Sequence, residues 1–385
     1  MRTQLASSVT SEPLLLTPGP LTTSHSVRGS MLHDWGSRDA TFLDINEAAL
    51  EQLVEIVNGG ADYVAVPMQG SGTFAVEAML TTFIPKTGKV LILTNGVFGK
   101  RAARISEIAG HHVLVHHTPE NVPPDLTAVE QILIREPAIT HIFAVHCETS
   151  SGLLNPIENL ALLAAGYRKN LLIDAVSTYG GIKLDAPTLK FDALAASPNK
   201  CLEGVPGLSF VICRKGALDA TKGNATTLVL DLYDQWQHFV ETGQYRFTPP
   251  THVVVALHKA LEEFTAEGGV GTRGRRYQEN SRVLVDSMRA MGFETFLPDH
   301  LRAPIVATFL TPDDPHFVFE EFYQRLKCRG YIIYRGKLSQ AKSFQIACMG
   351  RLDAQEMGHA VSAIRNTLSE MGVQLKTPDR LCLSA

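Results

Sequence analysis

Short apolar runs with strand character alternate with stretches of helical periodicity through the first half of this chain. The strand-like runs lie at residues 63–66, 90–93, 112–115, 141–145 and 171–173, and helical periodicity fills gaps such as 73–83 and 99–109. This alternation is typical of parallel strands joined by crossover helices. We therefore predict an α/β fold with a mostly parallel sheet that helices cover on both faces.

The pattern changes after about residue 250. Two long helical stretches are followed by apolar strand-like runs at 305–309 and 343–348. A chain of 385 residues is long enough to form two hydrophobic cores. We predict a large domain at residues 22–255 and a smaller α+β domain made of residues 1–21 and 256–385.

The overall charge argues against nucleic acid or an acidic membrane surface as a partner. The sequence has 35 basic and 39 acidic residues, a net charge of −4, and we interpret the short basic run at 271–276 as a solvated turn. No run approaches the roughly 18 apolar residues of a membrane span, and Met1–Glu12 lacks the apolar core of a secretory signal. Six cysteines without a Cys-x-x-Cys pair favour a reducing, cytoplasmic setting.

Ligands of parallel α/β sheets bind at the carboxyl ends of the strands, so candidate binding residues follow the strand-like runs. Ser71, Gly72 and Thr73 follow the first run and open a helix, where backbone N–H groups and hydroxyls form a phosphate cup. The segment also fits a loose dinucleotide fingerprint, but no acidic residue ends the next strand to hold a ribose. Phe98, between glycines after that strand, is either a core residue or an aromatic cover for a planar ligand.

Two further residues suggest a specific chemistry at this edge. Asp174 ends a strongly apolar strand, where a carboxylate is costly unless a positive partner meets it. Lys200 follows an apolar turn at 194–196 in a loop of Pro, Gly and apolar residues, which lowers the pKa of the amine and favours imine formation. Pyridoxal phosphate offers an aldehyde for Lys200, a ring nitrogen for Asp174 and a phosphate for the cup. We therefore predict this cofactor.

Other patterns point away from metal or thiol-protease chemistry. Four histidines, at 111, 112, 116 and 117, divide between the two faces of a strand, so no three converge on a metal. His146 and Cys147 are neighbours in a strand and point to opposite faces, which disfavours a catalytic dyad. We predict no metal site.

Seven motifs together resemble the class V family of fold-type I pyridoxal-phosphate aminotransferases. They are Thr-Pro-Gly-Pro at 17–20, Asp-Trp-Gly-Ser-Arg-Asp at 34–39, Gln-Gly-Ser-Gly-Thr at 69–73, His-Cys-Glu-Thr at 146–149, Ile-Asp-Ala-Val-Ser at 173–177, Ser-Pro-Asn-Lys-Cys at 197–201 and Arg-Phe-Thr-Pro-Pro-Thr-His at 246–252. The resemblance extends from about Leu14 to Met371. It implies the fold-type I architecture and a transaminase that uses pyridoxal 5'-phosphate.

The resemblance also implies a role for each matching residue. Lys200 is expected to be the Schiff-base lysine and Asp174 the partner of the ring nitrogen. The other cofactor contacts that it implies are Ser71, Gly72, Thr73, Phe98, Thr149, Val176 and Asn199. In relatives, the residues that match Tyr245 and Thr248 reach the phosphate of the neighbouring subunit, which implies a homodimer with shared active sites.

The chain departs from the family where the substrate's anionic group binds. Family members read Ile-Tyr-Pro-Gly-Lys and then Phe-Arg-Ile, whereas this chain has Arg335 in place of the proline and Gln345 in place of the arginine. A neutral amide cannot supply the bidentate charged contact that an anionic substrate favours. Either Arg335 takes over this contact, with Gly19 also at the substrate site, or the substrate differs.

The implied reaction is ping-pong transamination between a small amine donor and a 2-oxo acid, with 2-aminoethylphosphonate and pyruvate as the expected pair. Gln345 leaves open another class V activity, of alanine–glyoxylate or serine–pyruvate type, or a modified aminophosphonate donor. A non-enzymatic alternative is a protein that binds the cofactor without turnover and serves binding or regulation. The presence of Lys200 and Asp174 argues against it.

Overall fold

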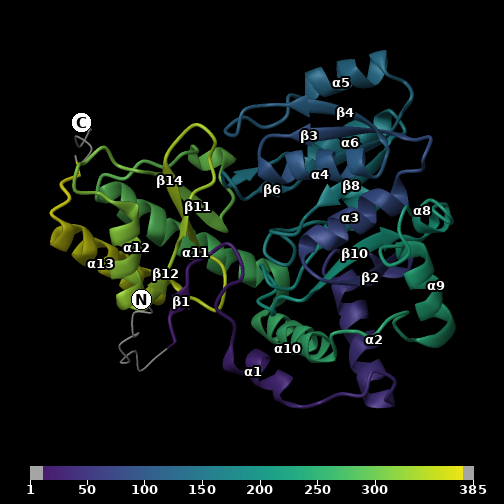
Figure 1. The fold of residues 1–385 in the computed structure, drawn as a ribbon, viewed down its shortest axis with the longest axis horizontal. Helices are drawn as coiled ribbons and strands as arrows, with labels where there is room; N and C mark the ends of the chain where they lie inside the picture. The colour runs from purple at the N-terminus through teal and green to yellow at the C-terminus, as the bar shows by residue number, and fades with distance from the viewer. Residues whose placement is uncertain (1–11, 376–385) are drawn as a thin grey trace, which may run out of the picture.

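The computed structural model describes residues 12–375, so the prediction for Met1–Glu12 concerns a segment that lies almost wholly outside the described residues. Figure 1 shows two lobes, a large one around a seven-stranded sheet and a small one that holds the C-terminal helices. No helix in the described part of the chain is long and apolar enough to cross a membrane.

The sheet of the large lobe has the strand order β2-β10-β9-β8-β5-β3-β4. Strand β10 is antiparallel to both of its neighbours, and the other adjacent pairs are parallel. The strands are β2 (Tyr63–Gln69), β3 (Lys89–Thr94), β4 (His112–His117), β5 (Ile139–Val145), β8 (Asn170–Asp174), β9 (Ala193–Ala196) and β10 (Leu208–Arg214). The prediction of a mostly parallel sheet is confirmed.

The prediction of an apolar turn at residues 194–196 was wrong, because these residues belong to strand β9. All four residues of β9 are buried, and the strand pairs with β8 on one side and β10 on the other. Its composition of one leucine and three alanines lacks the β-branched and aromatic residues that usually mark a strand. Pairing on both sides decides its conformation.

Helices cover both faces of the sheet, as predicted. One face packs against α2, α5, α6 and α10, and the other against α3, α4 and α9. These helices are α2 (Ala40–Glu55), α3 (Gly72–Phe83), α4 (Val97–Ile108), α5 (Leu126–Arg135), α6 (Ile157–Gly166), α9 (Leu232–Thr242) and α10 (Thr251–Glu267). The shorter elements are α1 (His25–Gly29), η1 (Ser30–Leu32), η2 (Gly60–Asp62), β6 (Cys147–Glu148), β7 (Leu153–Leu154), α7 (Ala186–Leu189), α8 (Lys215–Asp219) and η3 (Asp299–Leu301).

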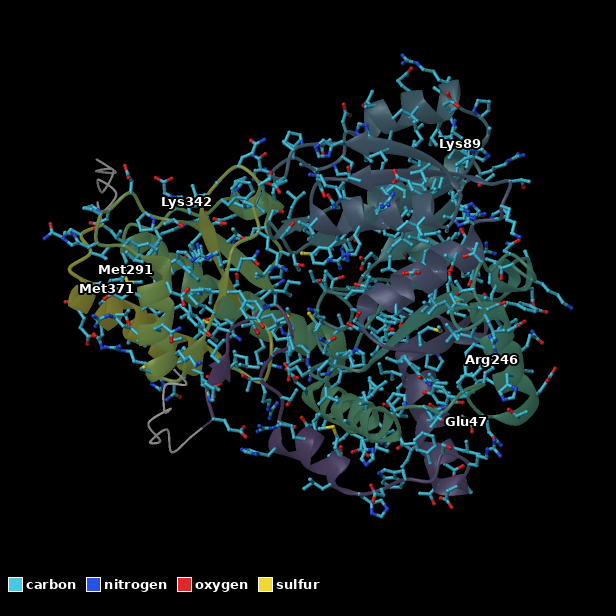
Figure 2. The ribbon with its side chains drawn as sticks, viewed as in Figure 1. Glu47, Lys89, Arg246, Met291, Lys342 and Met371 are labelled. Carbon is cyan, nitrogen blue, oxygen red and sulfur yellow. The ribbon has the colours of Figure 1, made fainter. Side chains whose placement is uncertain are left out.

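The small lobe is built on an antiparallel sheet with the order β11-β14-β13. Its elements are β11 (Val306–Leu310), β13 (Tyr334–Arg335), β14 (Ser343–Ala347), α11 (Gly269–Ala290), α12 (Phe319–Cys328) and α13 (Ala354–Met371). The N-terminal arm joins this lobe, since β1 (Leu14–Leu15) pairs in parallel with β12 (Tyr331–Ile332). Figure 2 shows Met291, Lys342 and Met371 in the small lobe and Lys89 in the large one.

The domain boundary expected at residue 255 falls inside helix α10. The apolar face of α10, which includes Leu257 and Leu261, packs in the core of the large lobe. Helix α11 instead contributes Leu284 and Met288 to the core of the small lobe. We therefore propose that the boundary lies at Gly268–Gly269, where both residues have positive φ and the chain turns from α10 into α11.

Candidate active site

A pocket of about 260 Å³ lies at the carboxyl ends of β5, β8 and β9. Eight of the residues predicted from the sequence line it, namely Ser71, Gly72, Thr73, Phe98, Asp174, Val176, Asn199 and Lys200. Because parallel strands end at one edge of the sheet, residues 100 or more positions apart meet here. The pocket is therefore the candidate active site.

Lys200 lies just after β9 and is held by the N-terminal arm. Its Nζ donates to the carbonyl oxygens of Pro18 at 2.5 Å and Gly19 at 3.4 Å. Gly19 has φ +104°, and a Cβ there would lie 2.8 Å from the backbone oxygen of Asn199 and against the Lys200 side chain, so this position favours glycine. Gly19 is thus placed against Lys200 and does not itself line the pocket. Burial lowers the pKa of Lys200 to about 8.

Asp174 ends β8 and faces the same pocket. Its Oδ1 accepts a hydrogen bond from the backbone N–H of Val176 at 3.0 Å, which fixes the carboxylate relative to the sheet. Burial raises the pKa of Asp174 to about 6, while the Val176 hydrogen bond opposes this shift. Most of the carboxylate is therefore still ionised at pH 7, and a buried anion of this kind favours a cationic partner.

The phosphate cup lies at the start of helix α3, where Ser71 is the N-cap. A Cβ at Gly72 would come within 2.6 Å of Val176 Cγ1, so the cup depends on glycine at this position. Arg101 also lines the pocket and donates from Nη1 to Thr73 Oγ1 at 3.0 Å. The helix N-terminus and the guanidinium together favour an anion here.

Sequence reasoning missed Arg101, although its spacing from Phe98 contains a signal. The two residues are three positions apart on α4 and share one face of that helix. The guanidinium of Arg101 lies 5.0 Å from the centre of the Phe98 ring. An arginine one turn beyond a predicted ring-covering aromatic, at the start of a strand-end helix, is a candidate anion ligand.

Glu148 fixes the start of α4 and therefore the positions of Phe98 and Arg101 on that helix. Its Oε2 accepts from the backbone N–H groups of Phe98 at 3.1 Å and Gly99 at 3.3 Å, and Ser150 Oγ donates to Oε1 at 2.5 Å. Burial raises the pKa of Glu148, and these hydrogen bonds oppose the rise. We infer that Glu148 acts as a positioning residue at the N-terminus of α4.

Besides Gly19, the pocket lining also lacks the predicted residues Thr149, Arg335 and Gln345. Gln345 is buried in β14, where its Nε2 donates to the carbonyl oxygens of Thr149 at 2.6 Å and Ser150 at 3.1 Å. Arg335 is exposed and lies over the ring of Phe319, 4.8 Å from its centre. The arginine is therefore not placed where it could replace the family's substrate arginine, and Thr149 presents its backbone to the glutamine.

Tyr245 and Thr248 also lie away from the pocket of their own chain. The hydroxyl of Tyr245 donates to Asn46 Oδ1 at 2.9 Å, and Thr248 is exposed on the surface. Their absence from the lining of this pocket is compatible with the expectation that they serve the neighbouring subunit.

The interpretation of residues 271–276 as a solvated turn was wrong. The segment belongs to helix α11, and the side chain of Arg273 is only 1% exposed. Arg273 binds Glu267 at 2.7 Å, and Arg276 binds Glu203 at 2.7 Å. Arg273 also donates to the carbonyl oxygen of Cys201 at 3.1 Å. The basic run therefore anchors the segment that directly follows Lys200.

Removing one partner of this buried cluster is expected to destabilise the protein strongly. Arg273→Met is expected to lower the free energy of unfolding by about 3 kcal/mol, because buried carboxylates lose a cation and Arg276 compensates only in part. Urea unfolding at pH 7 measures this change. Arg282→Met, on the exposed side of the same helix, is the control and should leave stability unchanged. Equal effects of the two variants contradict a structural role for the cluster.

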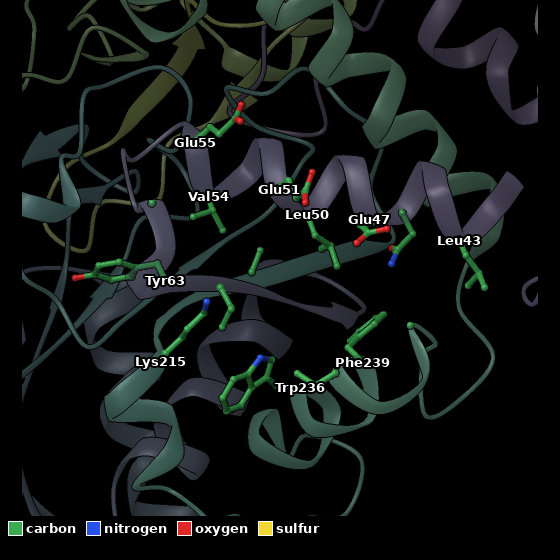
Figure 3. Close-up of a pocket in the computed structure, with 16 residues that line it drawn as sticks. Leu43, Glu47, Leu50, Glu51, Val54, Glu55, Tyr63, Lys215, Trp236 and Phe239 are labelled. Atoms are coloured by element: carbon green, nitrogen blue, oxygen red, sulfur yellow. The ribbon is translucent and has the colours of Figure 1, made fainter. Parts of the chain in front are cut away.

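A larger cavity, of about 680 Å³, lies between α2 and α9 (Figure 3). Figure 3 shows Glu47 on α2 across the cavity from Trp236 and Phe239 on α9. Neither Asp174 nor Lys200 lines this cavity. Size alone therefore does not identify the site, and the chemistry at the strand ends favours the smaller pocket.

Known proteins with similar sequences match nearly the whole chain. The aminotransferase class-V family matches residues 21–321. The 2-aminoethylphosphonate–pyruvate transaminase of Pseudomonas aeruginosa (strain UCBPP-PA14) is 48% identical over 361 residues, which are 94% of this chain and 97% of that protein. The transaminase of the same name from Cupriavidus taiwanensis is 47% identical over 365 residues, 95% of this chain and 97% of the relative.

Solved structures share the fold. Pyridoxamine–pyruvate aminotransferase from Mesorhizobium loti has a TM-score of 0.87 at 24% identity, and the match covers 96% of each of the two chains. Alanine–glyoxylate aminotransferase from Nostoc sp. has a TM-score of 0.85 at 24% identity, with 95% and 98% covered. The predicted fold-type I architecture is confirmed. Because the class-V family matches more than half of this chain, the chain belongs to the class V aminotransferases and is a transaminase.

Proposed function

We propose that this transaminase uses 2-aminoethylphosphonate as amino donor and pyruvate as acceptor, giving phosphonoacetaldehyde and alanine. The observation that carries the proposal is that Lys200, Asp174 and the Ser71–Thr73 cup line one pocket. This arrangement fits pyridoxal 5'-phosphate, whose aldehyde, ring nitrogen and phosphate need an amine, an anion and a cup of N–H donors. The names of the relatives at 47–48% identity support the donor.

The residues of the pocket fit this cofactor. Its phosphate would be held by the cup together with Arg101, its ring nitrogen by Asp174, and one face of its ring by Phe98. Val176 and Asn199 would complete the contacts from this pocket, and a contact of Thr149 with the ring hydroxyl stays a prediction from the family resemblance. When bound, the cofactor supplies the electron sink that makes the donor's C–H bond acidic.

The chain's own residues then handle charge and protons. Asp174, ionised at neutral pH, would stabilise the protonated form of the ring nitrogen. Lys200 Nζ, as a free amine, would accept the proton from the donor's carbon and hold it for the return transfer. A lysine whose pKa is lowered to about 8 is suited to both roles near neutral pH.

The pKa of Lys200 predicts how the cofactor-free enzyme captures pyridoxal 5'-phosphate. Only the neutral amine attacks the aldehyde, so the second-order rate should rise about tenfold per pH unit below pH 8 and level off above it. Stopped-flow absorbance from pH 6.5 to 9.5 measures this profile. A rate that continues to rise to pH 9.5 contradicts a lowered pKa for this lysine.

We propose in addition that two copies of the chain share their active sites and that the protein is cytoplasmic. Phe247, the chain neighbour of the exposed Thr248, is itself 44% exposed, and an exposed aromatic residue here favours a partner. The cysteines that the structure describes are unpaired, which suits a reducing compartment. Analytical ultracentrifugation of the cofactor-loaded enzyme tests the dimer.

A donor panel tests the proposed reaction most directly. With pyruvate as acceptor, alanine formation is compared for 2-aminoethylphosphonate, a hydroxylated aminophosphonate and serine, and glycine formation measures the separate reaction of alanine with glyoxylate. We expect 2-aminoethylphosphonate to give the highest kcat/KM. A preference for serine, or for alanine with glyoxylate, supports the second candidate, which Gln345 favours. A yellow protein that no amine bleaches supports a binding protein without turnover.

A further inference from the structure

The proposed donor has a dianionic phosphonate, and a cation is needed to receive it. Gln345 is neutral, and its Nε2 is engaged with backbone oxygens and Thr308 Oγ1 at 3.0 Å. Arg335 lies over the ring of Phe319 outside the pocket. Arg101 lines the pocket but is bound to Thr73 in the phosphate cup. A different cation must therefore meet the donor.

The position of Lys337 in the structure makes it the candidate cation for the donor. It lines the pocket together with Asp174 and Lys200, although it comes from the small lobe. It follows Gly336, whose backbone N–H donates to the carbonyl oxygen of Ser343 at 2.8 Å and so closes the hairpin between β13 and β14. Burial is the main cause that lowers the pKa of Lys200, and the positive charge of Lys337 lowers it further. This effect is consistent with proximity of the two ammonium groups.

The loop that carries Lys337 is attached to the large lobe. Two residues further on, Ser339 donates from its backbone N–H and from Oγ to Glu120 Oε2, both at 3.0 Å. Glu120 lies in the connection between β4 and α5. Two hydrogen bonds to one carboxylate attach the loop to the large lobe. The backbone on both sides of Lys337 is thus restrained, and Lys337 itself is an exposed residue that lines the pocket.

We infer that Lys337 binds the anionic group of the amino donor, in the role that an arginine at position 345 serves in the family, and that the Glu120–Ser339 contact positions it. This inference rests on the proposed function for the identity of the donor. A lysine ammonium is a compact point charge that suits a phosphonate oxygen, whereas the planar fork of an arginine suits bidentate binding.

Lys337→Met removes the charge and keeps most of the side-chain length. We expect KM for 2-aminoethylphosphonate to rise about 10- to 100-fold, the range for losing a hydrogen bond to a charged group, with a smaller change in kcat. KM for pyruvate should change less. Lys342→Met is the matched control, since Lys342 is an exposed lysine of the same loop, and KM should stay within twofold. A KM in Lys337→Met within twofold of wild type overturns the inference.

A binding measurement separates this inference from the proposed function. Ethylphosphonate, which has no amine to react, is titrated calorimetrically into the cofactor-loaded wild type, Lys337→Met and Lys342→Met. Weaker binding to Lys337→Met alone supports the inference even if the donor panel selects another amine. Equal binding to all three proteins, or no binding to the wild type, overturns it. Failure of 2-aminoethylphosphonate turnover with the binding difference intact rejects only the proposed donor.

The positioning role of Glu120 is tested by a double-mutant cycle. Glu120→Ala should raise the donor KM about 3- to 10-fold in the wild type and leave it unchanged in Lys337→Met, because the contact acts only through Lys337. Independent, multiplicative effects on KM overturn the positioning role of Glu120. Thermal unfolding of each variant shows whether the protein remains folded.

Discussion

Replacing Lys200 by alanine is expected to lower kcat by on the order of 10⁴-fold. A positioned acid–base group contributes up to about 10⁴-fold to the rate. We expect this upper value because the same amine also binds the cofactor. The yellow absorbance of the loaded enzyme should be lost or shifted as well. Steady-state alanine formation and absorbance spectra measure the two effects.

The control for this variant is Lys222→Ala, which removes an exposed lysine outside the pocket. It should keep both wild-type turnover and the wild-type spectrum. If Lys200→Ala retains more than about a tenth of the wild-type kcat, another amine performs the chemistry and the assignment of Lys200 is wrong.

Replacing Asp174 by asparagine is expected to lower kcat roughly 100- to 1,000-fold without destabilising the fold. The loss corresponds to breaking a buried charged pair between the carboxylate and the ring nitrogen. Because burial raises the pKa of Asp174 to about 6, its ionisation disfavours the folded cofactor-free protein above that pH. The amide removes this cost, so the cofactor-free variant should be at least as stable as wild type at pH 8.

Asp192→Asn is the matched control for this prediction. Asp192 is a buried carboxylate far from the pocket chemistry, paired with Arg214 and accepting from the backbone N–H of Leu171 at 2.7 Å. Its replacement should leave kcat per folded molecule near that of wild type, because Asp192 does not line the pocket. A normal kcat in Asp174→Asn contradicts the role given to Asp174.

Much of the fold and part of the site follow from local sequence pattern. Strand periodicity predicts the parallel sheet, and parallel strands bring their carboxyl ends together, so Ser71, Asp174 and Lys200 could be expected in one place. The resemblance to the class V family extends that expectation to Phe98 and Asn199. These are short-range signals, and each is carried by residues next to a strand end.

The remaining features depend on contacts that no local pattern contains. Lys337 reaches the pocket only because the small lobe places its hairpin loop there, and Ser339 binds a loop of the other lobe. Arg273 looks solvated in a run of glycines and arginines, yet tertiary packing buries it against Glu267. Its position in the sequence favours Arg335 as the replacement cation, but its guanidinium lies over the Phe319 ring and outside the pocket lining.

The most direct measurement is borohydride reduction of the pyridoxal 5'-phosphate-loaded enzyme, followed by peptide mapping. Two lysines line the pocket, Lys200 and Lys337, so the map distinguishes between them. The account predicts a reduced cofactor adduct on Lys200 and an unmodified Lys337. An adduct on Lys337, or on neither lysine, contradicts it.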